Sequence, residues 1–115
     1  EYINLSRCKE LNNVKFPKEI TGYLVLTSME SLDGISLPKK YRSINLYSIE
    51  KLENFVFPEE CEYINLSRCK ELNNVKFPKI IKGYLDLRSL KSLEGVKLPE
   101  KYKYLYLISI FLWYH

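Results

Sequence analysis

The sequence predicts a β-rich solenoid, a stack of about five and a half coils with parallel strands and little or no helix. Residues 1–18 (EYINLSRCKELNNVKFPK) recur unchanged as residues 62–79. Each unit also holds two short segments in which apolar and polar residues alternate, which is typical of half-buried strands. A single unit of about 20 residues cannot bury its own apolar face, so neighbouring units must stack on one another. The shorter period is marked by prolines spaced 20 or 21 residues apart, at Pro17, Pro38, Pro58, Pro78 and Pro99.

The proline spacing divides the chain of 115 residues, taken as one domain, into consecutive units. These units are residues 1–21, 22–41, 42–61, 62–82 and 83–102, with a partial unit at 103–115. Two units carry an additional residue, Thr21 or Lys82, which we expect in a turn. Each proline is expected to end the second strand, because it has no N–H to give to a ladder of hydrogen bonds.

Alignment of the units predicts which side chains form the core. The first strand supplies two inward columns: Ile3, Leu24, Ile44, Ile64, Leu85, Leu105, and Leu5, Leu26, Leu46, Leu66, Leu87, Leu107. The second strand supplies two more: Val14, Ile35, Phe55, Val75, Val96, and Phe16, Leu37, Phe57, Phe77, Leu98. Just before the second strand, one column holds Asn or Gly alone, which predicts a positive φ angle there. Its members are Asn13, Gly34, Asn54, Asn74 and Gly95.

The column pattern I-x-L-x-x-C-x-x-L-x-x-V-x-F-P, as in residues 64–78, resembles the leucine-rich repeat. The short period and closing proline resemble the short bacterial type, and L-x-x-V-x-F-P resembles the BspA-like type. The pattern departs from the family by having no asparagine at the N/C position. The bacterial pattern implies that the first strand lines the concave side, and the BspA-like pattern implies the second. We favour the first strand. The resemblance further implies a module that binds another protein.

The outward positions of the first strand are the main candidates for a partner-binding face. One outward column is almost entirely tyrosine, and the adjacent column is rich in Asn. Exposed tyrosines offer a large amphipathic contact area at a small entropic cost, which favours recognition of a protein. Stacked aromatic side chains on neighbouring strands also stabilise a sheet with no ligand present, and this structural interpretation stays open. The candidate residues are Tyr2, Tyr23, Asn45, Tyr63, Asn65, Tyr84, Asp86 and Tyr104.

A secondary basic face is expected on the second strand, where Lys15, Lys76 and Lys97 point outward. Such a stripe suits acidic partners, but charged residues on a sheet also keep its face and edges solvated. Ser36 and Val56 interrupt the stripe, which favours the second interpretation. The chain carries 18 basic and 14 acidic residues, a balance that gives no support to a nucleic-acid partner.

The residues that enzymes and metal sites need are scarce. Cys8, Cys61 and Cys69 make an odd number, and they share columns with apolar residues, so we expect buried free thiols. The lone His115 has no ligand partners in the sequence. No phosphate-binding glycine loop, zinc-binding or nucleophile motif is present. We therefore expect no cofactor, no metal and no enzymatic activity.

The last unit ends on an apolar tail, Phe111, Leu112, Trp113 and Tyr114. Three interpretations stay open: a lid over the last coil, an association surface for another copy, or the cut end of a longer protein. The second supports an alternative function, a structural or self-assembling element that forms homo-oligomers through uncapped ends. The apolar run from Tyr104 is too short to span a membrane. The compartment stays open, because no signal peptide is visible in this chain.

Overall fold

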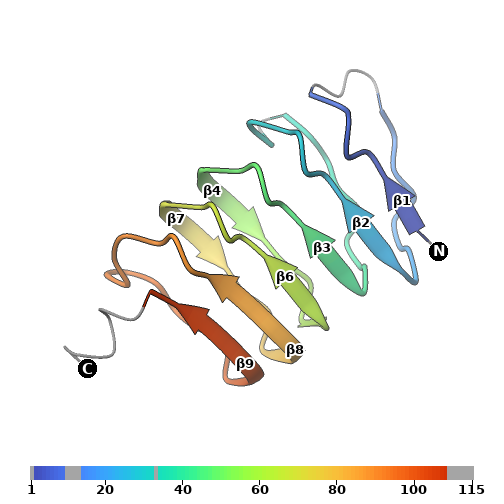
Figure 1. Ribbon diagram of the computed structural model, residues 1–115. Helices are drawn as coiled ribbons and strands as arrows, with labels where there is room; N and C mark the ends of the chain where they lie inside the picture. The colour runs from blue at the N-terminus through green and yellow to red at the C-terminus, as the bar shows by residue number, and fades with distance from the viewer. Residues whose placement is uncertain (1, 10–13, 33, 109–115) are drawn as a thin grey trace.

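The computed structural model describes residues 2–9, 14–32 and 34–108, and these form a parallel β-solenoid (Figure 1). The first strands of the units stack side by side in one sheet, from the N-terminal to the C-terminal end of an elongated molecule of 44 × 25 × 21 Å. In stacking order these strands are β1 (Tyr2–Asn4), β2 (Tyr23–Val25), β3 (Ser43–Asn45), β6 (Tyr63–Asn65), β8 (Ile80–Leu87) and β9 (Lys101–Leu107). The predicted fold class is confirmed.

The strands pair in the register that the unit alignment predicts. Tyr23 lies opposite Tyr2 and Ser43, and Leu24 lies opposite Ile3 and Ile44. Alternate side chains of each strand therefore point into the core, and the two inward columns of the first strand form its centre. The side chains with no exposed surface include Leu24, Leu26, Leu46, Ile64, Leu66, Leu85 and Leu87.

The second strand forms in two of the units and not in every unit as the pattern predicts. β4 (Lys51–Val56) and β7 (Glu71–Lys76) pair in parallel as a separate sheet behind the first (Figure 1). In units 22–41 and 83–102 the chain turns instead, and the amides of Ile35 and Val96 donate to the carbonyls three residues earlier. These two units have glycine at the centre of the turn, and glycine favours the positive φ that such a turn requires.

The column of Asn and Gly has the backbone conformation that the sequence predicts. Gly34 and Gly95 both have φ of 73°, and Asn54 and Asn74 have φ of 51° and 53°. The Nδ2 group of Asn74 donates to Oδ1 of Asn54 at 2.9 Å, so the two asparagines also link neighbouring coils. The prediction is confirmed at these four positions, and Asn13 lies outside the described residues.

The additional residue of unit 62–82 is not in a turn as expected. Lys82 lies within β8, where Lys82 and Gly83 together face a single residue of β9, between the pairs Ile81–Tyr102 and Tyr84–Tyr104. The inserted residue is absorbed as a β-bulge, which leaves the strand pairing intact on both sides. One edge of β8 also pairs with the two-residue strand β5 (Glu60–Cys61). Thr21 lies in a bend, as expected.

None of the described residues lies in a helix, so the described part of the chain holds no helix that could cross a membrane.

Hydrogen bonds from serine hydroxyls link neighbouring coils. Ser89 Oγ donates to the carbonyl of Ser67 at 2.6 Å, and Ser28 and Ser48 donate in the same way to Ser6 and Met29. Because these bonds link residues 19 to 22 positions apart, they fix the coils relative to one another.

Candidate binding face

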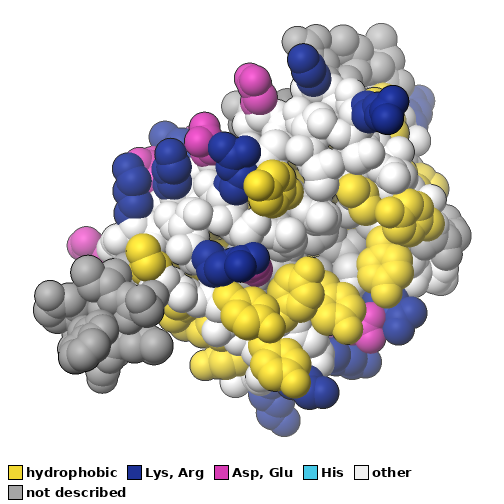
Figure 2. All heavy atoms as spheres, in the orientation of Figure 1, with side chains coloured by type: hydrophobic (Ala, Val, Ile, Leu, Met, Phe, Trp, Pro, Cys, Tyr) yellow, Lys and Arg dark blue, Asp and Glu magenta, His cyan; other side chains and the backbone are white. Residues whose placement is uncertain are grey.

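The tyrosine column lies on the outer side of the large sheet and forms a surface called here the tyrosine face. Figure 2 shows hydrophobic side chains gathered over the strands of this sheet, with Lys and Arg side chains around them. Exposure is greatest toward the two ends, where Tyr2 is 60% and Tyr104 51% exposed. The face consists of Tyr2, Tyr23, Tyr63, Tyr84, Tyr104 and Tyr106.

The rings of the tyrosine face form two clusters. Tyr2 and Tyr23 meet edge to face with centroids 6.1 Å apart. Tyr63 packs against Tyr84 at 4.8 Å, and Tyr84 packs in turn against Tyr106 at 5.9 Å. Tyr106 lies in the adjacent, Asn-rich column, and its ring contact with Tyr84 makes it part of the face. Burial raises the pKa of the Tyr84 hydroxyl, and the nearby Asp86 carboxylate raises it further.

Ser43 separates the two clusters. It occupies the tyrosine column, directly between Tyr23 and Tyr63 in the parallel register. The side chain is buried, with 5% of its surface exposed, although an outward position in this column predicts exposure. Its small size explains the difference, because larger side chains on both neighbouring strands cover it.

The Asn column next to the tyrosines has a structural role that the sequence pattern did not reveal. Oδ1 of Asn45 accepts a hydrogen bond from the Tyr47 amide at 3.0 Å, and Oδ1 of Asn65 accepts one from the Ser67 amide at 2.9 Å. These bonds hold the turn that follows each strand, as Asn side chains often do. Both side chains remain half-buried at the edge of the tyrosine face. The signal was present in the sequence as a recurrent Asn two residues before a turn.

The prediction that Asp86 is an exposed contact residue is wrong. Asp86 is only 4% exposed, because its carboxylate is covered and forms an ion pair with Arg88 at 2.7 Å. The same carboxylate accepts a hydrogen bond from the backbone amide of Arg88, as the side chains of Asn45 and Asn65 do from the amides of their own turns. The pKa of the Arg88 guanidinium is raised by this hydrogen bond and by the charge of Asp86. Arg88 is thus the exposed group at this position.

A second ion pair lies beside the face. The Arg42 guanidinium binds the Glu62 carboxylate through Nε and through a second contact of 3.2 Å. The hydrogen bond to Glu62 raises the pKa of Arg42, and the bond to Arg42 lowers the pKa of Glu62. The two charges neutralise each other next to Ser43 and Tyr63, their neighbours along the chain.

A hollow of about 210 Å³ opens at the break in the tyrosine column. Its walls come from Tyr2, Tyr23, Ser43, Tyr63 and Tyr84, and the Asn column closes it at one side. None of the residues that line it carries a charge. The geometry therefore suits a neutral, flat group more than an ion.

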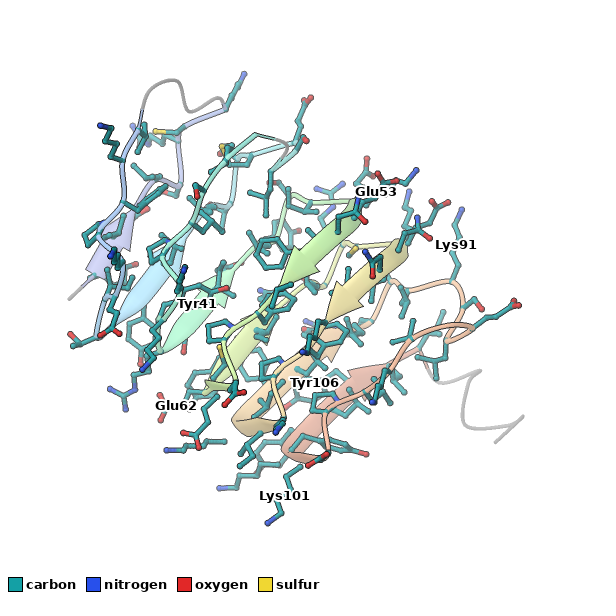
Figure 3. The ribbon with its side chains drawn as sticks, turned by 180° about the vertical axis from the view of Figure 1, so that it is seen from behind. Tyr41, Glu53, Glu62, Lys91, Lys101 and Tyr106 are labelled. Atoms are coloured by element: carbon teal, nitrogen blue, oxygen red, sulfur yellow. The ribbon has the colours of Figure 1, made fainter. Side chains whose placement is uncertain are left out.

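The predicted basic face lies behind the tyrosine face, on the side that Figure 3 shows. Lys15, Lys76 and Lys97 are exposed, and Val56 interrupts their stripe with 69% of its surface exposed. Two hollows of about 950 and 540 Å³ lie here, between unit 22–41 and the strand β4. They arise because unit 22–41 turns where β4 would need a strand partner. The three lysines do not line these hollows.

Two of the three cysteine thiols lie in the core. Cys61 and Cys69 are buried, as predicted, whereas Cys8 is half-buried. Burial raises the pKa of the Cys61 thiol to about 12 and that of Cys69 to about 11, so both stay protonated at neutral pH. Across residues 2–9, 14–32 and 34–108, no three His, Cys, Asp or Glu side chains gather where they could hold a metal ion.

The apolar tail, Phe111, Leu112, Trp113 and Tyr114, lies outside the described residues, as does His115. Comparisons of the chain with protein-family models, with curated proteins and with solved structures gave no match. The fold and the chemistry of its surfaces are therefore the basis for a functional conclusion.

Proposed function

We propose that this solenoid is a non-enzymatic module that binds another protein through its tyrosine face. The observation that carries the proposal is the row of tyrosine rings along the large sheet, which stays partly exposed from Tyr2 to Tyr106. Tyr is enriched in protein interfaces because its ring gives contact area and its hydroxyl gives a hydrogen bond. A rigid sheet holds these rings in place before binding, which reduces the entropy lost on association.

The repeat pattern supports the same proposal. Its resemblance to short bacterial and BspA-like leucine-rich repeats favours a solenoid that recognises proteins. The parallel sheet of first strands agrees with such a repeat, and the tyrosine face lies on that sheet. We extend the proposal to the repeat type on this basis, as an inference from pattern and architecture.

The experiment replaces Tyr23, Tyr63 and Tyr84 together by serine. A partner is first selected against the intact chain from a displayed library of small protein domains. We expect the triple variant to lose at least about tenfold in affinity, since aromatic residues often dominate interface energies. The control is Tyr47→Ser, because Tyr47 is exposed but lies in the turn after β3. If the triple variant is folded and binds the partner as tightly as the intact chain, the proposal fails.

A second proposal, self-assembly through the ends of the stack, is favoured by β9. In the described residues β9 pairs with β8 alone, and its exposed side chains include Tyr102, Tyr104 and Tyr106. An open strand edge of this kind can pair with another chain. Light scattering over a wide concentration range, with and without residues 111–115, tests the proposal. Growth that disappears without the tail supports assembly, and a monomer at every concentration contradicts it.

A further inference from the structure

The break in the tyrosine face at Ser43 has the dimensions of one missing ring. Tyr23 and Tyr63 each lie one strand away from Ser43, so they are separated by about twice the strand spacing of 4.8 Å. A ring midway between them would lie about 4.8 Å from each, within the range of 4.5–7 Å that aromatic pairs prefer. The contact of Tyr63 with Tyr84, at 4.8 Å, shows the same spacing within the face itself.

The volume at the break agrees with this spacing. The hollow measures about 210 Å³ and is lined by tyrosine rings, aliphatic carbon and two asparagines, with no charged group. Cavities of about 150 Å³ in protein cores are large enough to hold benzene. A phenol or indole ring therefore fits the hollow, and the absence of charge in its walls favours a neutral occupant.

The floor of the hollow carries an unsatisfied polar group. Ser43 Oγ is buried and is the one buried side-chain polar atom in the described part of the chain that has no hydrogen-bond partner. Such groups are rare, because an unmade hydrogen bond in the interior is unfavourable. Tyr23, which lies beside Ser43 in the strand register, is 37% exposed, and its side chain must rotate for a ligand to reach the hydroxyl. An occupant with a hydrogen-bonding group at its tip would satisfy Ser43.

We infer that the hollow at Ser43, called here the slot, receives a tyrosine side chain of the partner protein, inserted tip first between Tyr23 and Tyr63. The partner's ring completes the stack, and its hydroxyl hydrogen-bonds Ser43 Oγ at the floor. Phenylalanine fills the same space but leaves Ser43 without a partner, so the slot distinguishes the two residues. This inference rests on the proposed function, because it names the group by which the tyrosine face recognises a protein.

The test uses N-acetyl-L-tyrosinamide as the probe and the full chain labelled with ¹⁵N for NMR. We expect shift changes that saturate and that centre on the amides of Ser43 and its neighbours on β2 and β6. N-acetyl-L-phenylalaninamide should bind about three- to tenfold more weakly, the ratio expected for one hydrogen bond. Shift changes that centre on Tyr104 and Tyr106, or equal affinity for the two probes, would overturn the inference.

Two variants of Ser43 sharpen the test. Ser43→Tyr supplies the missing ring from the chain itself and should abolish the shift changes, while Tyr104→Ser, in the same column outside the slot, should retain them. Ser43→Ala keeps the space but removes the hydroxyl, so both probes should bind it equally. This second variant replaces a small side chain by a smaller one, so its result stands even if Ser43→Tyr disturbs folding. Persistent discrimination by Ser43→Ala contradicts the role of the hydroxyl.

The selected partner separates this inference from the proposed function. If Ser43→Tyr leaves the partner's affinity unchanged while the triple tyrosine variant abolishes binding, the face is the interface and the slot inference is wrong. If both Ser43→Tyr and the triple variant bind the partner normally, the proposed function has failed. A loss of partner affinity in Ser43→Tyr, together with the probe results, supports both.

Discussion

The 18 residues that occur twice in this chain fold in two different surroundings. Residues 62–79 lie inside the stack, with β6 between β3 and β8, whereas β1 of residues 1–18 pairs with β2 alone in the described residues. The same side chains are fully buried in the inner copy and half-buried in the outer copy: Ile64, Leu66 and Cys69 against Ile3, Leu5 and Cys8. The second strand differs as well, because Val75 and Lys76 belong to β7 while Val14 and Lys15 belong to no strand.

The local structure of the two copies is the same. Oδ1 of Asn4 accepts the Ser6 amide at 2.9 Å, and Oδ1 of Asn65 accepts the Ser67 amide at 2.9 Å. Local sequence therefore determines the first strand and the turn after it. Burial comes from having a coil on both sides, which is the nearest-neighbour behaviour expected of a solenoid. The second strand needs more than this, because unit 22–41 also has a coil on each side and turns instead, whereas β4 and β7 form by pairing with each other.

The largest difference in stability is expected between matched Leu→Ala substitutions in the two copies. Leu66→Ala removes a side chain with no exposed surface, and we expect it to reduce the free energy of unfolding by about 2–5 kcal/mol. Leu5→Ala, the same change in the same local sequence, should cost about 1 kcal/mol, because Leu5 is half-buried and its surroundings can relax. Urea denaturation followed by circular dichroism measures both. Equal losses would show that local sequence and not the stack determines the stability.

The stability of the fold at alkaline pH tests whether water is excluded from around the buried thiols of the inner coils. The Cys61 and Cys69 thiols have pKa values of about 12 and about 11 in the folded chain, against 9.0 for an unperturbed thiol. Above pH 9 the thiols of the unfolded chain lose protons that the folded chain retains, so the free energy of unfolding falls as pH rises. Below pH 9 the thiols are protonated in both states, and no stability is lost. At pH 10 each thiol should remove about 1.4 kcal/mol.

Urea denaturation in a reducing buffer at pH 8 and pH 10 measures this loss. The matched control is the double variant Cys61→Val, Cys69→Val, which carries near-isosteric side chains that do not titrate. We expect the control to lose much less stability than the intact chain over this interval, with Tyr41 contributing a part because burial raises its pKa as well. The same pH dependence in both proteins would refute a dry environment for the thiols.

The tyrosine face shows the same contrast at smaller scale. The Tyr63 ring lies over Gly83, where an added Cβ would clash with the ring carbons, and it packs against Tyr84. Tyr2, its counterpart in the outer copy, is 60% exposed. We expect Tyr63→Ser to cost about 1–2 kcal/mol and Tyr2→Ser about 0.5 kcal/mol, since aromatic pairs add to the effect of burial. Thermal unfolding of both variants measures the difference, and a larger loss for Tyr2→Ser would contradict it.

Sequence periodicity was enough to predict the solenoid, the strand register and the inward columns of the first strand, because these depend on the alternation of side chains along each strand. The second strand followed the prediction less closely, since Val14 of its inward column is 44% exposed. The periodicity was also enough to place Gly34, Asn54, Asn74 and Gly95 at positive φ, since few residue types tolerate that conformation. The prediction was less complete for features that depend on the neighbouring coils. Whether a unit forms its second strand depends on the adjacent coil as well as on its own residues.

The candidate site was predicted in outline for the same reason. The tyrosine column could be identified from the alignment, but the burial of Ser43 depends on the large rings on both sides of it. Asp86 looked exposed because its strand position points outward, whereas its ion pair with Arg88 covers it. Ion pairing of this kind depends on side-chain conformations, which an alignment of the repeat units does not specify.

The smallest expected effect concerns Asn74, which has φ of 53° within β7. Asn74→Ala places a side chain that disfavours positive φ at this position, and we expect a loss of about 1 kcal/mol. Asn74→Gly tolerates the conformation and loses only the exposed hydrogen bond to Asn54, so its stability should change by less than about 0.5 kcal/mol. Gly34 and Gly95 occur where the chain turns instead of forming a strand, so Asn74→Gly also tests the origin of that difference. If β7 keeps its amide protection in Asn74→Gly, the adjacent strand β4 is what maintains β7, whereas a loss of protection would assign that role to Asn74 itself.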